Sequence, residues 1–311
     1  MRILIIEKPE MTPVSWWRCF MPLQMMRRLD PNFEFEITDK FSDGDLTRFD
    51  ALLLFRPSYP VEMSAIATAK KMGLKVIVDY DDDFQNVPEF SPVFGKIMEP
   101  ERQNVVRAVA ATADMVWTTT EAISTAMQRP DAHVIPNAVP EIWIPKKPAK
   151  NTKSASWRGR EMQYMDVVFQ GIVSGWYNQI ATLPEVWTWM GWMPFPRAEG
   201  PKHVFREYGN ITQYMDYVRN AGINVLWKPL VECQFNDAKS NISWIEATIG
   251  GGVCVTNYAG KKWWEHALPD FTFDDKVLRE TWEVSAQSVY ERHNLKATAR
   301  QRLTLLKQLM K

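Results

Sequence analysis

Hydrophobic residues in the first half of the chain form short continuous runs, and amphipathic stretches separate these runs. Runs such as Asp50–Phe55 (D-A-L-L-L-F) and Lys75–Asp79 (K-V-I-V-D) are typical of parallel strands that helices cover on both faces. The predicted strands are Arg2–Ile6, Phe33–Ile37, Asp50–Phe55, Lys75–Asp79, Met115–Thr118 and His133–Ile135, and the predicted helices are Trp17–Leu29, Val61–Met72, Arg102–Ala111 and Glu121–Met127. This alternation predicts a doubly wound α/β domain, whose ligands bind beyond the carboxyl ends of its strands.

The alternation stops between Pro136 and about Lys153, where the sequence is rich in proline and lysine. Such a composition is typical of an extended linker, although a long surface loop within one domain is the alternative. Strand and helix patterns then resume, with strands at Ser156–Arg158, Val186–Gly191 and Ile223–Leu226, and helices at Met162–Val173, at Thr212–Asn220 and from Lys276 onward. The sequence therefore predicts two α/β domains, residues 1–140 and residues 155–311 with the C-terminal helices, joined by a linker at 141–154.

The composition bounds the class of protein. The 311 residues, 46% of them hydrophobic, suffice for two packed cores, and no apolar run is long enough to span a membrane. The first residues, M-R-I-L-I-I-E, lack the long apolar region of a signal peptide. Three widely spaced cysteines argue against a disulfide framework or a zinc site, so we expect a cytoplasmic protein. Acidic and basic residues balance at 37 each, so the chain has no overall positive field that would attract nucleic acid.

The segment Phe235–Thr256 carries the most specific signal, because it combines a polar loop, an amphipathic helix, a triple-glycine helix stop and a buried strand. Ile242, Ile245 and Ile249 have helical spacing, and Glu246 lies among them. A carboxylate in apolar surroundings loses hydration energy unless a partner binds it. The two hydroxyl groups of a nucleotide ribose would be a suitable partner. A surface helix with a solvated glutamate is the alternative.

This segment resembles the donor-binding helix of GT-B glycosyltransferases of the large retaining, sucrose-synthase-like family, in which an E-x7-E pattern holds the nucleotide sugar. Glu246 matches the second glutamate, which binds the ribose in that family, whereas Ala238 stands where the first would be. The form F-N-x-A-K-S-N-x-x-W-x-E-A is similar to a divergent phage and bacterial branch. Asn236, Lys239 and Ser240 are candidates to replace the missing glutamate.

Three other segments resemble the same family in the same order along the chain. Trp16–Leu23 (W-W-R-C-F-M-P-L) is similar to the segment that follows the first strand in that family. Val134–Val139 (V-I-P-N-A-V) is similar to the end of its first domain, and Trp157–Asp166 to the opening of its second, with Gln163 in place of the usual histidine. The resemblance implies the GT-B fold, in which two doubly wound Rossmann-like domains face a central cleft.

The resemblance also implies a function: transfer of a sugar, with retention, from a nucleotide sugar such as a UDP-sugar to a hydroxyl acceptor. Arg158 and Gly159, at the first strand-to-helix turn of the second domain, are suited to bind a diphosphate, although a surface salt bridge is the alternative for Arg158. The candidate residues are Arg158, Lys239 and Asp82 for catalysis, Gly159, Asn236, Ser240, Asn241 and Glu246 for the donor, and Arg18, Asp81, Asp83 and His266 on the acceptor side.

An acidic cluster, V-D-Y-D-D-D-F at Val78–Phe84, follows a predicted buried strand. Clustered carboxylates suit Mg²⁺ or Mn²⁺, and a D-x-D motif binds a metal in the other large glycosyltransferase fold, GT-A. Acidic residues after a strand also cap helices. Because GT-B members resemble one another in needing no metal, we expect neither a metal nor a cofactor, and we expect the cluster to face the cleft. Phosphate-binding P-loop and dinucleotide-binding glycine motifs are absent from the sequence.

The sequence leaves the identity of the acceptor open. A surface glycan is the first expectation, and a hydroxymethylated base in phage DNA is the alternative, for which the linker lysines Lys146, Lys147, Lys150 and Lys153 could supply part of a basic cleft. The balanced net charge favours the glycan. Because the first glutamate of E-x7-E is missing, a non-catalytic sugar- or nucleotide-binding protein is a further alternative.

Overall fold

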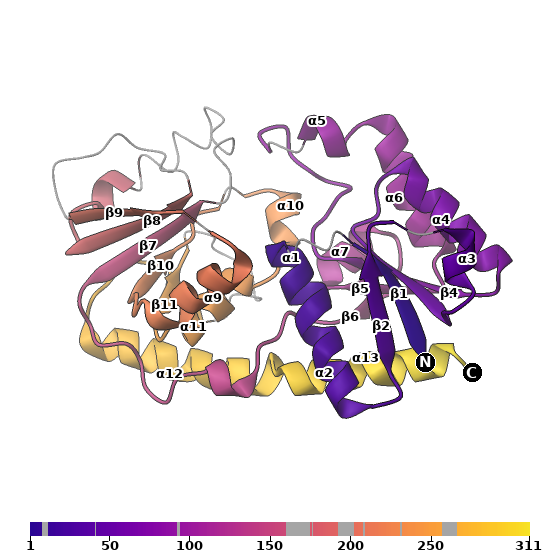
Figure 1. Ribbon diagram of the computed structural model, residues 1–311. Helices are drawn as coiled ribbons and strands as arrows, with labels where there is room; N and C mark the ends of the chain where they lie inside the picture. Colours follow the sequence, from indigo (N-terminus) through magenta and orange to yellow (C-terminus); the bar gives the residue numbers. More distant parts are fainter. Residues whose placement is uncertain are drawn as a thin grey trace.

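The computed structural model contains two parallel β-sheets, and helices cover both faces of each sheet (Figure 1). The structure describes residues 1–7, 12–40, 42–91, 94–159, 175, 177–191, 202–207, 209–230, 232–256 and 266–311. The first sheet has the strand order β2-β1-β3-β4-β5-β6 and the second has the order β11-β10-β7-β8-β9. All pairs of neighbouring strands in both sheets are parallel, which confirms the predicted α/β class with two doubly wound domains.

The boundaries of the elements follow the predicted ranges closely in the first half. Its strands are β1 (Arg2–Ile6), β2 (Glu34–Thr38), β3 (Ala51–Phe55), β4 (Lys75–Tyr80), β5 (Met115–Thr118) and β6 (His133–Val134). Its helices are α1 (Pro13–Ser15), the π-helix η1 (Trp16–Phe20), α2 (Met21–Leu29), α3 (Asp43–Leu46), α4 (Pro60–Lys71), α5 (Phe94–Ile97), α6 (Pro100–Thr112) and α7 (Glu121–Ala126). Proline stands at the start of α4 and of α6, where a backbone N–H would have no partner within the helix, so its absence costs no hydrogen bond.

The second half contains the remaining elements. Its strands are β7 (Ser154–Gly159), β8 (Val186–Gly191), β9 (Lys202–Arg206), β10 (Val225–Trp227) and β11 (Val253–Val255). Its helices are the 3₁₀ turn η2 (Glu141–Trp143), α9 (Ile211–Asn220), α10 (Gln234–Asp237), α11 (Ile242–Ile249), α12 (Asp275–Arg292) and α13 (Leu295–Leu309). The strand β9 and the short helix α10 were not among the predicted elements, and the predicted helix at 162–173 lies outside the described residues.

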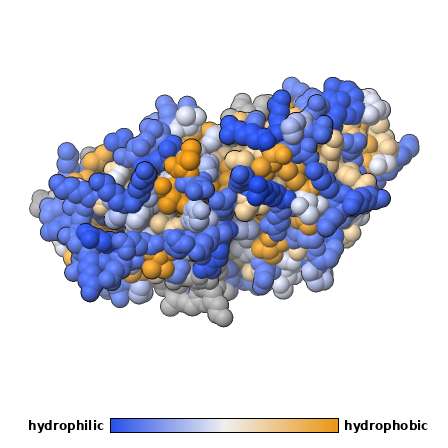
Figure 2. Space-filling model, turned by 90° about the horizontal axis from the view of Figure 1, so that it is seen from below, coloured by the Kyte–Doolittle hydropathy of each residue, from blue (hydrophilic) through white to orange (hydrophobic). Residues whose placement is uncertain are grey.

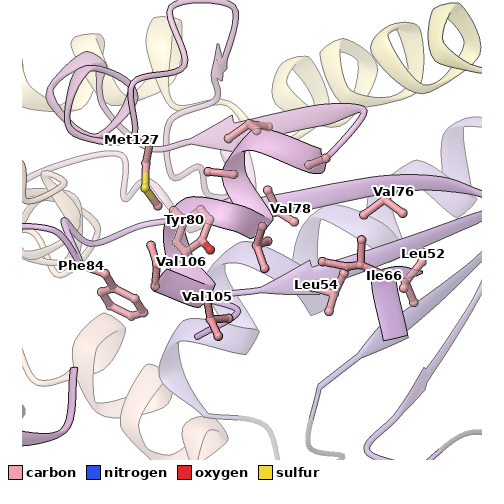
Figure 3. Close-up of a cluster of buried hydrophobic side chains, with 14 of the residues drawn as sticks. Leu52, Leu54, Ile66, Val76, Val78, Tyr80, Phe84, Val105, Val106 and Met127 are labelled. Atoms are coloured by element: carbon pink, nitrogen blue, oxygen red, sulfur yellow. The ribbon is translucent and has the colours of Figure 1, made fainter. Parts of the chain in front are cut away.

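Alternating side chains of the central strands of the first sheet fill two separate cores. Leu52 and Leu54 of β3 point to the face that α4 and α6 cover, together with Val76 and Val78 of β4 (Figure 3). Leu53 points to the opposite face, toward α2 and α13. This alternation follows from the two-residue period of a strand, and burial on both faces explains why these strands are continuous apolar runs.

The C-terminal helix α13 packs against the first sheet, although the sequence assigned the whole C-terminal region to the second domain. Its residues Ala299, Leu303 and Leu306 are buried in the same cluster as Ile3 and Leu53. Figure 1 shows α12 beneath the second sheet and α13, in yellow, continuing beneath the first, so the two chain ends lie near each other. The helix pattern alone does not distinguish the two partners, because an apolar helix face can pack on either sheet.

The second sheet is built around tryptophan. Trp157, Trp187, Trp189 and Trp227 lie on one face of β7, β8 and β10, and their rings pack against one another and against Tyr177. These four tryptophans therefore fill a core.

The face that α12 and α13 form is mainly hydrophilic, with small groups of hydrophobic residues (Figure 2). In the part of the chain that the structure describes, no helix combines the length and hydrophobicity that crossing a membrane requires.

Candidate functional site

Each sheet has one point at which the chain reverses its direction of winding. In the first sheet this point lies between β1 and β3, and in the second it lies between β7 and β10. Ligands of such sheets bind in the crevice outside the carboxyl ends of the two strands. In the second sheet these ends carry Arg158 and Gly159 on β7 and Trp227 on β10, and in the first sheet β3 is followed by Arg56.

A buried polar cluster lies at the switch point of the second sheet. The Nη1 atom of Arg158 donates to the Oε2 atom of Glu246 on α11 at 3.0 Å, and the Tyr214 hydroxyl on α9 donates to the same oxygen at 2.6 Å. All three side chains are buried, and Glu246 is 1% exposed. Burial alone would lower the pKa of Arg158, but the neighbouring Tyr214 and Glu246 more than offset this and raise it. The structure thus brings together Arg158, predicted for catalysis, and Glu246, predicted for the donor, and adds Tyr214, which the sequence did not indicate.

The glycine at the end of β7 lies beside a second glycine. Gly159 pairs in register with Gly191 at the carboxyl end of β8. Two adjacent strands therefore end in residues without side chains at the edge where ligands bind, and glycine allows a ligand to approach the backbone closely. Gly191 was not among the predicted residues, because the sequence alone does not give the pairing register.

The start of α11 contacts the first domain. The Asn137 side chain donates to the Ser240 hydroxyl at 2.9 Å, and the Thr120 hydroxyl donates to the Ala238 carbonyl at 2.9 Å. Asn236, on α10, is buried, and the neighbouring Phe235 belongs to the hydrophobic core of the first domain. The polar loop of the predicted donor segment is therefore part of the domain interface.

An ion network links the acidic cluster to the second domain. Arg56 pairs with Asp81 through its Nε atom and with Asp82 at 2.8 Å, and Lys239 lies 3.5 Å from Asp82. Arg56 has a positive φ of 49°, a strained conformation for a residue with a side chain, and such strain clusters at functional sites. These four side chains are 13–30% exposed, so the network lies at the edge of the interface.

The structure does not place all of the predicted acceptor residues toward the cleft. Arg18 is 1% exposed and binds both oxygens of the equally buried Asp79, at 2.9 and 3.0 Å. Arg302, from α13, adds a contact of 3.4 Å to the same carboxylate. Burial beside Arg18 lowers the pKa of Arg302 to about 9. The expectation that Arg18 faces the cleft is therefore wrong, because its guanidinium group is held in the interior by Asp79.

Asp83 is likewise buried, at 2% exposure. Its carboxylate accepts hydrogen bonds from the backbone of Gln85 at 3.0 Å and from the Asn86 side chain at 2.7 Å. It stabilises the turn after β4 and does not point into the cleft, which corrects its predicted acceptor role. Among the residues that the structure describes, no group of three histidine, cysteine, aspartate or glutamate side chains is arranged to hold a metal ion.

Two histidines lie near α11. His266, predicted on the acceptor side, is half-buried, with its ring centroid 6.0 Å from that of Trp244. His293 was not predicted as a site residue. Its Nδ1 atom lies 2.8 Å from the Asn137 carbonyl, and its Nε2 atom lies 3.0 Å from the side chain of Asn241, the residue that precedes α11. No local sequence pattern indicates His293, because its partners are 156 and 52 residues away.

The sequence matches no family model and none of the curated proteins. Solved structures do match the fold. HepE from Anabaena, in complex with UDP-glucose, superposes with a TM-score of 0.67 over 99% of this chain and 100% of that chain, at 10% identity. The chain has the GT-B fold.

Two further GT-B neighbours show how much this likeness establishes. A glycosyltransferase from Rickettsia africae superposes with a TM-score of 0.60 over 100% of this chain and 98% of that chain, at 10% identity. A UDP-N-acetylglucosamine 2-epimerase from Rickettsia bellii reaches 0.51 over 99% and 96%, at 12% identity. At such identities the likeness establishes the fold, and the reaction has to be argued from the site.

Proposed function

We propose that this protein is a glycosyltransferase that moves a sugar from a UDP-sugar to a hydroxyl acceptor with retention of configuration. The observation that carries the proposal is the pair of Arg158 and Glu246 at the switch point of the second sheet. In a GT-B fold this point faces the cleft between the domains, where a donor and an acceptor can meet. A cation and an anion side by side suit the two polar parts of a nucleotide, its diphosphate and its ribose.

The donor would bind by replacing contacts within this cluster. Glu246 would accept hydrogen bonds from ribose hydroxyl groups, and the Arg158 guanidinium would turn toward the diphosphate, to which it can donate two parallel hydrogen bonds. The paired glycines Gly159 and Gly191 would let the diphosphate approach the backbone N–H groups at the ends of β7 and β8. Ser240 and Asn241 at the start of α11, together with Asn236, would hold the sugar between the two domains.

Lys239 and Asp82 are suited to the reacting centre because they meet across the interface. Departure of the diphosphate breaks the bond between the sugar carbon and the phosphate oxygen and leaves negative charge on that oxygen. Lys239 would stabilise this charge electrostatically. The acceptor hydroxyl forms the new bond to the same carbon, and its proton passes to the departing phosphate oxygen, so the protein needs no strong base. Asp82 would orient the acceptor hydroxyl.

We propose that the reaction requires no metal ion. Asp81 and Asp82, the exposed members of the acidic cluster, already pair with Arg56 and Lys239, which supply the positive charge that a metal would bring to carboxylates elsewhere. We place the protein in a reducing cytoplasm, because Cys19, Cys233 and Cys254 are free thiols.

A surface glycan is our proposed acceptor. The chain has no net charge, so it offers no general positive field to the phosphates of a nucleic acid. A hydroxymethylated base in phage DNA is the second candidate, and the linker lysines are the feature that favours it.

The decisive experiment is a melting-temperature screen with UDP-glucose and other nucleotide sugars, because a tight ligand stabilises the folded state by mass action. Sugars that bind are then incubated with the protein and glycan acceptors, and the products are analysed. Transfer, or release of UDP and free sugar, supports a glycosyltransferase. Binding without turnover would favour a non-catalytic binding protein, and a 2-epimer of the sugar would favour an epimerase.

A further inference from the structure

Two buried side chains, Asn137 and His293, hold the two residues that precede α11. Asn137 is 3% exposed and His293 is 7% exposed, and the Nδ1 atom of His293 lies 2.8 Å from the Asn137 carbonyl. The Asn137 side chain reaches the Ser240 hydroxyl at 2.9 Å, and the His293 ring reaches the Asn241 side chain at 3.0 Å. Ser240 and Asn241 are partly exposed, so these two candidate donor residues can meet a ligand while buried side chains hold them from behind.

Arg18 determines which atom of the Asn137 amide faces Ser240. An arginine side chain can only donate hydrogen bonds, and the Nη1 atom of Arg18 donates to the Oδ1 atom of Asn137 at 3.4 Å. Arg18 is itself held by both oxygens of Asp79. The Nδ2 atom of Asn137 therefore faces Ser240 and donates to its hydroxyl oxygen. The Ser240 hydroxyl keeps its own proton, which it can donate to another partner.

The Asn137 carbonyl sets the orientation of the Asn241 amide in the same way. A carbonyl can only accept, so the Nδ1 atom of His293 carries the proton of this contact. In the neutral ring the Nε2 atom is then an acceptor, and it receives the amide N–H of Asn241. Among the residues that the structure describes, no hydrogen bond is made to the Oδ1 atom of Asn241, so this oxygen can accept from a ligand.

Asparagine before a helix commonly uses this oxygen to cap the helix. Asn210 and Asn294 do so, because they accept from backbone N–H groups in the first turns of α9 and α13. Asn241 makes no such bond to α11, and its ψ of 24° differs from the extended values of 168° and 119° at the other two. The contact with His293 thus holds the Asn241 side chain away from the capping position.

We infer that Asn137 and His293 are positioning residues that fix the direction of two hydrogen bonds to the donor sugar, with Ser240 as a donor and Asn241 as an acceptor. This inference rests on the proposed nucleotide-sugar function. A sugar hydroxyl both donates and accepts, so a donor and an acceptor on adjacent residues suit one hydroxyl or two neighbouring ones. UDP lacks the sugar, so the two positioning residues should affect the binding of a UDP-sugar but not that of UDP.

Asn137→Asp tests the first of these bonds, because it keeps the shape of the side chain and replaces the amide N–H groups with an oxygen that only accepts. Ser240 must then donate to this oxygen and cannot donate to the sugar. The new charge is matched, since Arg18 and Arg302 outnumber Asp79 in the adjoining cluster. Titration calorimetry should show about threefold to tenfold weaker binding of UDP-glucose, or of the UDP-sugar that the melting-temperature screen selects, and unchanged binding of UDP.

His293→Asn and His293→Gln form a matched pair that tests the second bond. The shorter asparagine amide lies near the place of Nδ1 and can still bind the Asn137 carbonyl, whereas the glutamine oxygen can reach the Asn241 amide. His293→Asn should weaken UDP-glucose by the same factor, and His293→Gln should bind it as the wild type does. Combining His293→Asn with Asn241→Ala should weaken UDP-glucose no further than Asn241→Ala alone, because His293 acts through Asn241.

The outcomes separate the inference from the proposed function. Thermal melts of the free proteins show that each variant is folded at the assay temperature. If the wild type transfers sugar but Asn137→Asp and His293→Asn bind UDP-glucose normally, the inference is overturned and the proposed function stands. Equal weakening of UDP and UDP-glucose, or equal losses in the two His293 variants, would also overturn the inference. A wild type that binds no UDP-sugar would remove the proposed function itself.

Discussion

The replacement of Glu246 by alanine tests whether the buried pair at the switch point holds the second domain together. Glu246 and Arg158 are 1% and 7% exposed, and the alanine variant would leave the Arg158 guanidinium buried without this partner. Loss of one partner of a buried ion pair costs about 3–5 kcal/mol. A domain of this size loses about 2–4 °C of melting temperature per kcal/mol, so we expect a fall of roughly 6–20 °C.

A double-mutant cycle measures the coupling energy between Arg158 and Glu246. Arg158→Met and Glu246→Met each leave a buried charge, whereas the double variant removes both charges and should lose much less than the sum of the single variants, with a coupling energy above about 1.5 kcal/mol. Glu185→Ala is the matched control, because Glu185 pairs with Lys153 on the surface at the opposite end of the same sheet and should not change the melting temperature. Single variants that add within about 0.5 kcal/mol would refute the coupling.

UDP binding is measured on a variant with a more conservative substitution. Glu246→Gln keeps the size of the side chain and can still accept from the Tyr214 hydroxyl, so the protein should remain folded at the assay temperature. Loss of a charge-assisted hydrogen bond to the ribose costs about 1.5–3 kcal/mol, so UDP should bind roughly ten- to a hundred-fold more weakly. Titration calorimetry measures this affinity. Wild-type affinity for UDP would make Glu246 a structural residue alone and would remove it from the donor site.

Three other predictions concern charges elsewhere. Turnover should be unchanged in excess chelator, since Arg56 and Lys239 already pair with Asp81 and Asp82, and a loss of activity that Mn²⁺ or Mg²⁺ restores would make these carboxylates a metal site. Asp79→Asn should lower the melting temperature more than Arg302→Met, because it leaves two buried guanidinium groups without a carboxylate; equal losses in a thermal melt would contradict the cluster's charge balance. Binding to unmodified duplex DNA should be undetectable in a fluorescence-anisotropy titration, whereas micromolar binding that weakens by roughly 0.9 log units per tenfold salt for each phosphate contact would favour DNA as the acceptor.

The sequence predicted the fold well because both sheets are parallel. A strand buried on both faces is a continuous apolar run, and the helices between such strands have their own spacing. The strand β9 was missed because its sequence K-H-V-F-R has neither an apolar run nor a clear alternation, and all five of its residues are only partly buried or exposed on an outer edge of the sheet. The position of α13 was missed for a different reason, since the cluster around Asp79 that holds it joins residues 284 positions apart.

The candidate residues divide according to what a local pattern can show. Glu246 was identifiable because one helix turn placed a carboxylate among isoleucines. Its pairing with Arg158 was not identifiable, because the pair depends on the distance between β7 and α11 in the folded sheet. The same limitation explains the two errors at Arg18 and Asp83. Arg18 lies in a helix and Asp83 follows a strand, and neither local sequence shows whether the charged group faces a cleft or has buried partners. Only the structure supplies its partner.

The two connections between the domains explain why the start of α11 is held so firmly at the interface. The chain crosses from the first domain at Val139 and returns at Asn294, and these residues pair in a parallel bridge. The Val139 N–H donates to the His293 carbonyl at 2.9 Å, and the Leu295 N–H donates to the Val139 carbonyl at 3.0 Å. The His293 ring then joins this bridge to Asn241 at the start of α11. The end of α11 that carries the candidate donor residues is thus fixed to the place where both connections meet.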